Sequence, residues 1–246
     1  MVILKCASIP NLRDLGDTVT MDGRKIRKDC LLRSAQLGNA SEEDVRYLQK
    51  EHRLRTVIDL RTDGEIKEKP DRAFDCLILH IPILRSFEAG ITHESKTEGM
   101  PYPDLAIFYR KTMRDEQCQE AFRRVLKVCF ENDYESGSVL WHCSEGKDRC
   151  GITAALLLEA LGVDRKIILE DYLETNTTNI PKAEFVRDRE LQKSGDAARA
   201  KCLYQAFVAD ERYIRNAWEA MGTHYLTDCL GFSEEELQSF RNRVLE

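Results

Sequence analysis

A cysteine followed six residues later by an arginine, Cys143 and Arg149, could together perform covalent chemistry on an anion. The loop between them follows a short apolar run at 138–142 and leads into a longer one at 151–161. The first run has the length of a strand and the second that of a buried helix. Ligands of α/β proteins bind at the carboxyl ends of strands, and backbone N–H groups at a helix start converge on anions. We therefore expect residues 143–149 to form an anion-binding loop.

The thiol of Cys143 is expected to lose its proton readily in that position. Helix N-termini and nearby cations lower a cysteine pKa to within about 3.5–7.5, so this residue is predicted to be a thiolate nucleophile. Arg149 offers a planar fork to two phosphate oxygens, and Gly146 permits backbone conformations that other residues resist. The expected reaction is attack on phosphorus, a cysteinyl-phosphate intermediate and hydrolysis by water. The residues expected to bind phosphate are Ser144, Glu145, Gly146, Lys147, Asp148 and Arg149.

A general acid is needed to protonate the leaving oxygen, and three aspartates are candidates. Asp148 lies inside the loop beside Arg149, and Asp59 ends a predicted strand from which it could reach the same rim. Asp104 precedes a predicted helix and is the third choice. The first two also have a structural interpretation. Asp148 could brace the loop, and Asp59 could form an ion pair with Arg61.

The neighbouring polar residues are expected to support the loop. His142 is predicted to brace it by hydrogen bonds and to tune the thiolate, whereas Lys147 either steers polyanionic substrates or is a solvated side chain. Arg33 and Arg61 are expected in ordinary salt bridges. The remaining histidines share no ligand spacing, so neither a metal nor a cofactor is expected.

The loop sequence at 142–151, HCSEGKDRCG, resembles the His-Cys-x-x-Gly-x-x-Arg loop of the protein-tyrosine-phosphatase family. Its Gly-Lys-Asp-Arg core resembles the bacterial and fungal branch of that family. Further similar stretches are Asn-Leu-Arg-Asp-Leu-Gly at 11–16, Leu-Arg-Ser-Ala at 32–35, Asp-Leu-Arg-Thr at 59–62, Asp-Tyr-Leu at 171–173 and Leu-Gly-Phe-Ser at 230–233. The resemblance implies a tyrosine-phosphatase-like α/β fold and activity on phosphotyrosine, phosphoserine/threonine or phosphoinositides, and it points to Asp148 as the acid.

Cys150 departs from this family pattern, which usually has Ser or Thr after the loop arginine. A thiol is a weaker hydrogen-bond donor than a hydroxyl, so Cys150 could slow breakdown of the intermediate. Alternatively, it could resolve oxidised Cys143 as a disulfide and make the site a reversible redox switch. Asp17, where the family tends to have a second Gly, is a smaller departure.

The elements that must hold the loop are predicted from apolar periodicity. Strands are expected at 30–33, 55–60, 76–84 and 138–142, with 55–60 and 76–84 as buried runs. Helices are expected at 41–51, from 105 to 131 with a break, at 151–161 and after 164. This order predicts a mainly parallel sheet flanked by helices, with a helical C-terminal part. The polar stretch 85–103 is predicted to be a lid or a binding loop.

Composition limits the remaining possibilities. A net charge of −6 argues against general nucleic-acid binding. The nine cysteines are odd in number and lack Cys-x-x-Cys spacing, which favours reduced thiols. No run has the length of a signal peptide or a membrane span, so a cytoplasmic protein without an integral membrane segment is predicted, with export without a cleavable signal as the alternative. The 246 residues suit a single phosphatase domain, 1–246.

The sequence thus predicts a metal-independent phosphomonoesterase acting on a phosphorylated protein, either at tyrosine or with dual specificity. A phosphoinositide phosphatase of the same fold is the first alternative, and a weakly active phosphate-binding or redox-sensing module is the second. Sulfur transfer by a rhodanese-type loop is disfavoured by Arg149 and by the loop length. No pattern in the chain predicts an oligomeric state.

Overall fold

The computed structural model of the chain describes residues 1–4, 6–85, 91 and 104–246. Its sheet has the strand order β1-β2-β3-β6-β4-β5. The strands are β1 (Val2–Ile3), β2 (Arg13–Asp14), β3 (Leu31–Ser34), β4 (Leu54–Asp59), β5 (Leu77–His80) and β6 (Ser138–His142). Pairing is parallel from β3 through β6 and β4 to β5, and antiparallel among β1, β2 and β3. The predicted mainly parallel sheet is confirmed.

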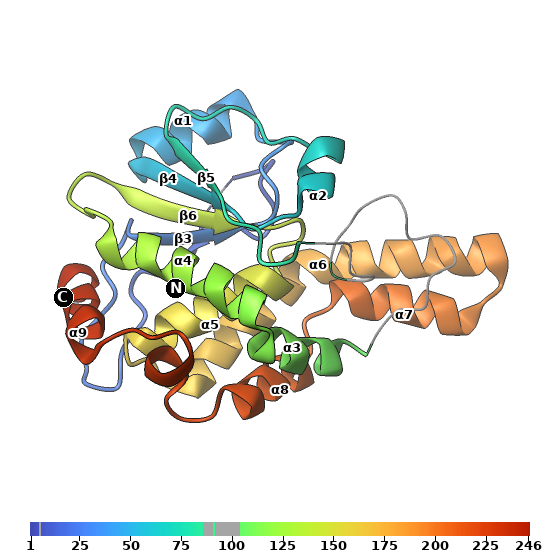
Figure 1. The fold of residues 1–246 in the computed structure, drawn as a ribbon. Coiled ribbons are helices and arrows are strands. Elements are labelled where there is room, and N and C mark those ends of the chain that lie inside the picture. The colour runs from blue at the N-terminus through green and yellow to red at the C-terminus, as the bar shows by residue number, and fades with distance from the viewer. Residues whose placement is uncertain (5, 86–90, 92–103) are drawn as a thin grey trace.

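Helices lie on both faces of this sheet (Figure 1). They are α1 (Glu42–Lys50), α2 (Asp63–Glu68), α3 (Leu105–Arg114), α4 (Glu116–Glu131), α5 (Asp148–Ala160), α6 (Arg165–Ser194), α7 (Ala197–Phe207), α8 (Glu211–Met221) and α9 (Glu234–Val244), with a π-helical turn at Tyr225–Cys229. α1 covers one face, and α3, α4, α5 and α8 cover the other. The predicted break between α3 and α4 is confirmed at Asp115, which accepts a hydrogen bond from Cys118 N at 2.9 Å.

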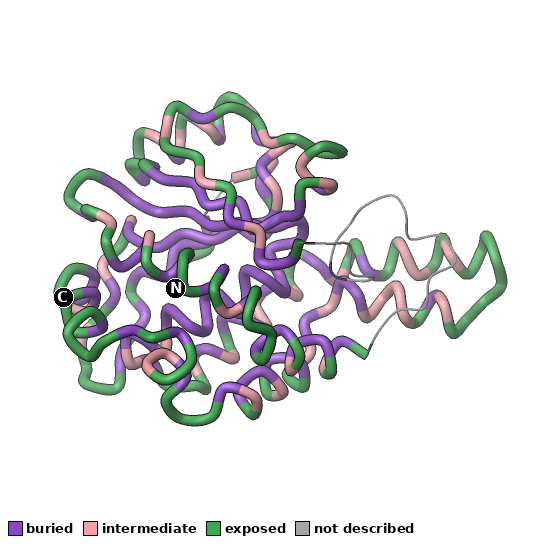
Figure 2. Tube along the Cα trace, viewed as in Figure 1, coloured by how far each residue is buried: buried purple, intermediate pink, exposed green. Residues whose placement is uncertain are grey.

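The alternation of strand side chains builds two cores. Leu140 of β6 joins a smaller core that includes Leu48 of α1. Its neighbours Val139 and Trp141 join the larger core under α4, α5 and α8. Successive strand residues point to opposite faces, so a strand buried on both faces is apolar throughout. Figure 2 shows the central strands β3, β4 and β6 and helix α5 mostly buried.

Two predicted elements differ from the structure. The strand expected as a buried run at 76–84 is shorter and lies at the sheet edge, where Leu77 is 56% and Ile78 49% exposed. Among the described residues β5 is last in the strand order and pairs with β4 alone, and backbone bonds from Ile81 N to Asp59 O at 2.9 Å and from Ile83 N to Leu60 O at 3.3 Å continue this contact beyond the strand. The helix expected at 151–161 begins earlier, at Asp148, so the end of the chemical loop is itself helical.

α6 and α7 form a hairpin that projects from the rest of the molecule (Figure 1). The hairpin has a small core of its own, formed by Ala183, Ala206 and Phe207. Phe185 of α6 is 66% exposed. The helices predicted after 164 are confirmed. Apart from Arg85 and Ile91, the predicted lid or binding loop at 85–103 lies outside the described residues. Among the described residues, no helix combines the length and hydropathy needed to cross a bilayer.

Candidate active site

The loop after β6 is shaped by close packing around Gly146. This glycine has φ +67°, and a Cβ there would lie 2.8 Å from Ser34 O and from Ala35 N. Asn11 Nδ2 donates to the carbonyls of Glu145 at 3.2 Å and Gly146 at 3.0 Å, and Arg33 Nη2 donates to Gly146 O at 2.8 Å. These donors hold the loop carbonyls on its outer side.

No side chain caps the amino end of α5 among the described residues. Lys147 occupies the N-cap position and makes no side-chain capping bond. The first N–H groups of a helix have no helical acceptor and carry positive potential. The parallel register places the ends of β3, β4 and β6 together, with Ser34 and Asp59 opposite His142. The loop therefore leaves the sheet at the edge where anions bind.

Cys143 is 2% exposed and lies against the start of α5. Burial acts to raise its pKa, but the hydrogen bonds from the Cys150 thiol and backbone N–H and the charge of Arg149 lower the pKa of Cys143 to about 6. The Cys150 thiol could also donate to Ser34 O at 3.6 Å. Burial also raises the pKa of Cys150, which keeps it a protonated donor.

Arg149 is held by a carboxylate that the sequence analysis did not select. Its Nη1 and Nη2 donate to Glu65 Oε2 at 2.6 Å and Oε1 at 2.8 Å. Nη1 also donates to Leu60 O at 3.4 Å, and Nη2 to Ile91 O at 3.2 Å. Its Nε is buried and has no hydrogen-bond partner among the described residues.

Glu65 also accepts a hydrogen bond from the hydroxyl of Ser144, and it belongs to the capping box of α2. Thr62 Oγ1 accepts from Glu65 N at 3.2 Å, and Glu65 Oε2 accepts from Thr62 N at 3.0 Å. Although burial opposes it, Arg149 holds the pKa of Glu65 well below its usual range. A Thr-x-x-Glu sequence after a predicted strand is the signal that could have located this residue.

Asp148 lies at the first turn of α5 and is 3% exposed. Its Oδ1 accepts a hydrogen bond from the Tyr109 hydroxyl at 2.7 Å and lies 3.3 Å from Lys147 Nζ. The Tyr109 hydroxyl is 2.8 Å from that of Tyr172. Oδ2 has no hydrogen-bond partner among the described residues. One oxygen of Asp148 is thus anchored and the other remains available.

Asp59 lies under the loop in an ion pair with Arg61. Arg61 Nη2 is 2.7 Å from Asp59 Oδ2 and 2.6 Å from Asp71 Oδ2. His142 Nε2 lies 3.0 Å from that Asp71 oxygen, and His142 Nδ1 lies 3.4 Å from Cys143 O. This arrangement agrees with the ion-pair interpretation of Asp59 and with the bracing predicted for His142.

Ligand atoms of Asp59, Asp71 and His142 lie within 4.8 Å of one another, as in a metal site. The guanidinium of Arg61 already contacts both carboxylates. Although burial opposes protonation, the hydrogen bond to Asp71 and the charge of Asp59 raise the pKa of His142. The guanidinium of Arg61 therefore supplies a counter-charge to both carboxylates from within the protein.

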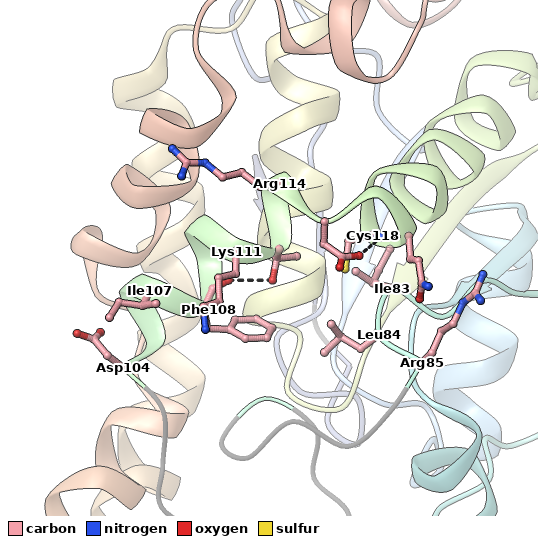
Figure 3. Close-up of a pocket in the computed structure, with 12 residues that line it drawn as sticks. Ile83, Leu84, Arg85, Asp104, Ile107, Phe108, Lys111, Arg114 and Cys118 are labelled. Carbon is pink, nitrogen blue, oxygen red and sulfur yellow. Dashed lines mark hydrogen bonds between the residues drawn. The ribbon is translucent and has the colours of Figure 1, made fainter.

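Asp104, the third acid candidate, caps α3 by accepting a hydrogen bond from Ala106 N at 2.9 Å. It lines a surface pocket of about 720 Å³ together with Leu84, Phe108 and Lys111 (Figure 3). None of the loop residues 143–149 belongs to the described lining of this pocket. The structure thus gives Asp104 a capping role.

Two arginines from the motifs at 11–16 and 32–35, Arg13 and Arg33, support the loop through a shared contact with α6. Arg13 Nε and Arg33 Nη1 bind the two oxygens of Asp171 at 2.7 and 2.5 Å. Although burial opposes it, these two arginines lower the pKa of Asp171. Arg33 also reaches Gly146 O. The predicted salt-bridge role of Arg33 is therefore combined with direct support of the loop.

Comparison with known proteins places these residues in context. The family model described as the tyrosine phosphatase family matches residues 4–246. A Cupriavidus necator protein named as a tyrosine-protein phosphatase is 33% identical over 177 residues, which are 70% of this chain and 62% of that protein. The triple specificity protein phosphatase PtpB of Mycobacterium tuberculosis is 30% identical over 195 residues, which are 68% of this chain and 66% of that protein. The chain thus spans a little under two thirds of the length of these relatives.

Among solved structures, that of P. aeruginosa TpbA covers 79% of this chain and 91% of its own, with 18% identity and a TM-score of 0.33. The core catalytic domain of the S. cerevisiae PP-IP phosphatase SIW14 covers 85% of this chain and 92% of its own, with 12% identity and a TM-score of 0.38. Both are too distant to say anything about the substrate of this chain.

Proposed function

This chain belongs to the tyrosine phosphatase family, and from that premise we propose that it is a cysteine-dependent phosphomonoesterase with Cys143 as its nucleophile. The observation that carries the proposal is the buried thiol of Cys143, whose pKa is lowered to about 6 between Cys150 and Arg149. A thiolate at neutral pH beside a helix N-terminus and an arginine is equipped to attack a bound phosphoryl group.

Arg149 would receive the phosphate through its side edge, formed by Nε and Nη2. Nε is buried without a partner among the described residues, and Nη2 donates to the carbonyl of Ile91 at 3.2 Å. A phosphate oxygen would satisfy the first group and replace Ile91 O at the second. Glu65 holds the adjacent end of the guanidinium through Nη1 and Nη2, so the group keeps its orientation while substrate exchanges.

The proposed reaction has two steps. The Cys143 sulfur attacks phosphorus, the bond to the leaving oxygen breaks, and that oxygen takes the proton from Oδ2 of Asp148. Water then attacks the cysteinyl phosphate and gives its proton to Asp148, the phosphorus–sulfur bond breaks, and inorganic phosphate leaves. Loop N–H groups and Arg149 stabilise the charge on the equatorial oxygens, and the Cys150 thiol stabilises the departing thiolate of Cys143.

We propose phosphotyrosine in a phosphorylated protein as the substrate, with phosphoserine and phosphothreonine as further substrates of a dual-specificity enzyme. The family match supports this, as does the similarity to a relative named a triple specificity protein phosphatase. Phosphoinositides are the alternative. A basic loop residue that reaches solvent would favour them, but the Lys147 side chain is buried.

We also propose that residues 1–246 act as one phosphatase domain in the reducing cytoplasm. The larger core joins α5 of the loop to the C-terminal helices α8 and α9, which supports one unit. All nine cysteines are free thiols, and the cytosol keeps a low-pKa thiol such as Cys143 reduced.

The test is hydrolysis of para-nitrophenyl phosphate, a phosphotyrosine peptide and a phosphoinositide under reducing conditions, with wild type beside Cys143→Ser. We expect wild type to hydrolyse the first two substrates and the variant to release no phosphate. Preferential turnover of the lipid would favour the phosphoinositide alternative. Folded, reduced wild type that binds phosphopeptide without turnover would instead indicate a binding or redox-sensing module.

A further inference from the structure

The ammonium group of Lys147 is enclosed between the loop and the end of α7. Its Nζ donates to Ala206 O at 2.5 Å and to Val208 O at 3.5 Å, and it lies 3.3 Å from Asp148 Oδ1. It also lies 5.7 Å from the centre of the Tyr213 ring. The side chain is fully buried, so neither the steering role nor the solvated side chain considered from the sequence describes it.

Three oxygens lie within 3.5 Å of the lysine nitrogen, two as hydrogen-bond acceptors and one as an ionic partner. An ammonium group has three donors, and here three oxygens surround it. Two of them are carbonyls at the C-terminal end of α7, where unpaired carbonyls carry partial negative charge and attract cations. A buried charge is tolerated when it is paired in this way. The third oxygen belongs to Asp148, so one side chain connects the end of α7 to the candidate acid.

The end of α7 is itself fixed by contacts that do not involve Lys147. Asn179 Nδ2 of α6 donates to Phe207 O at 3.1 Å. Lys182 of α6 lies 2.6 Å from Glu145 Oε1 and 4.9 Å from the centre of the Phe207 ring. The hairpin thus has its own attachment to the loop.

We infer that Lys147 is a positioning residue that transmits the location of the α7 end to Oδ1 of Asp148. Together with the Tyr109 hydroxyl it fixes Oδ1, so that Oδ2 faces the leaving oxygen. The inference rests on the proposed function, because it takes Asp148 as the general acid. The hairpin thereby contributes to catalysis, although none of its side chains needs to contact the phosphate.

Leaving groups of different basicity separate this role from a structural one. Nitrophenolate leaves readily without a proton, whereas phenolate needs one, so a misplaced acid slows phenyl phosphate selectively. We expect Lys147→Met to lower kcat/KM, which reports the step that releases the leaving group, on the order of tenfold more for phenyl phosphate than for para-nitrophenyl phosphate. Asp148→Asn should show the same selectivity more strongly. Adding Lys147→Met to Asp148→Asn should cause no further selective loss, because the two residues act as one unit.

Lys182→Met is the matched control, since it removes a second lysine between loop and hairpin without touching Asp148. It should change both substrates by the same factor. Lys147→Gln is the second variant in case Lys147→Met does not fold, because an amide can still donate to Ala206 O while it carries no charge.

An equal loss on both substrates in the folded Lys147 variants, or full additivity with Asp148→Asn, would overturn the inference. If Asp148→Asn itself shows no selectivity while Cys143→Ser is inactive, the acid assignment and this inference fail together and the nucleophile stands. Activity retained by Cys143→Ser would instead contradict the proposed function.

Discussion

At the residue scale, Cys150 stands where the resembling family usually has a hydroxyl, and it still provides a donor to the nucleophile. Both its thiol and its backbone N–H bond to Cys143. Its own pKa is raised by burial, so it remains protonated when Cys143 is a thiolate. The thiol of Cys150 is a weaker donor than a hydroxyl, so its contribution to the lowered pKa of Cys143 can be tested by substitution.

Cys150→Ala should raise the pKa of Cys143 by about one to two pKa units, because a hydrogen bond to a charged group contributes about 1.5–3 kcal/mol. The acid limb of kcat/KM, which rises as Cys143 ionises, should move to higher pH with it. The pH dependence of iodoacetamide alkylation measures the thiol directly. Cys150→Ser is the control and should keep the pKa of Cys143 at or below its wild-type value. If Cys150→Ala leaves the pKa of Cys143 unchanged, the thiol of Cys150 contributes nothing to it.

The disulfide between Cys143 and Cys150 stays a prediction. If it forms, hydrogen peroxide oxidises the Cys143 thiolate to a sulfenic acid, and the Cys150 thiol attacks that sulfur and releases water. Wild type treated with peroxide should then recover its activity in dithiothreitol, whereas Cys150→Ser should be inactivated irreversibly. Equal recovery of both proteins would rule the switch out.

Glu65→Gln tests the support of the loop arginine. Without the carboxylate, Arg149 keeps its charge in a buried site but loses its ionic partner, so its side edge is no longer held toward phosphate. We expect kcat/KM to fall roughly 10- to 100-fold, as for other lost positioning groups. Asp63→Asn is the matched control, since Asp63 lies in the same helix with a 97% exposed side chain, and its kinetics should stay at wild-type level.

At the element scale, α6 contributes to the site through its first turns as well as through the hairpin. Asp171 of α6 binds Arg13 of β2 and Arg33 of β3, so three elements meet at one buried carboxylate. Arg33 then reaches the loop at Gly146 O. The position of α6 therefore determines how the loop is supported from behind.

Asp171→Asn should lower the free energy of unfolding by about 3–5 kcal/mol, because it leaves two buried arginines without their counter-charge. Urea denaturation followed by circular dichroism measures the change. Asp188→Asn, in an exposed ion pair of the same helix, is the control and should leave the denaturation midpoint unchanged. Similar midpoints for the two variants would show that the buried pairs are dispensable.

At the scale of the whole molecule, the buried carboxylates set the pH range of stability. The pKa values of Asp171 and Glu65 are lower in the folded protein than in the unfolded chain. Each stabilises the fold above its unfolded value of about 4, and this contribution is lost as pH falls. The raised pKa of His142 acts oppositely, with its contribution complete below about pH 6.5 and lost as pH rises through the raised value.

The free energy of unfolding should therefore be largest between these limits and fall steeply from about pH 5 to pH 3. Urea titrations across pH 3–8 measure this profile. Asp171→Asn should flatten the acid side, because it removes one of the groups that must bind a proton. An acid slope as steep in the variant as in wild type would contradict the assignment of that group.

The chemical loop and its flanking elements could be predicted from the sequence because their signals are local. The sequence predicts strand β6 with its observed bounds, and it predicts a break within 105–131 whose position, Asp115, comes from the structure. Cys143, Arg149 and Gly146 could be selected together because one short loop must supply nucleophile, cation and turn. The side-chain partners could not be selected by the same reasoning.

Only the tertiary structure decided which residues complete the site. Glu65 meets Arg149 across 84 positions, Asp171 meets Arg33 across 138, and Lys147 meets Ala206 across 59. Each pairing depends on which helix packs against the loop and on how deeply a charge is buried. Neither of these can be predicted from the periodicity of the sequence. The sequence by itself determined the nucleophilic loop and the sheet that presents it, because backbone propensity and side-chain alternation act between near neighbours. The partners that hold Arg149 and Asp148 in place come from segments far away in the sequence. Tertiary packing brings them together, because a charge buried in the fold needs a counter-charge or a hydrogen-bond partner nearby.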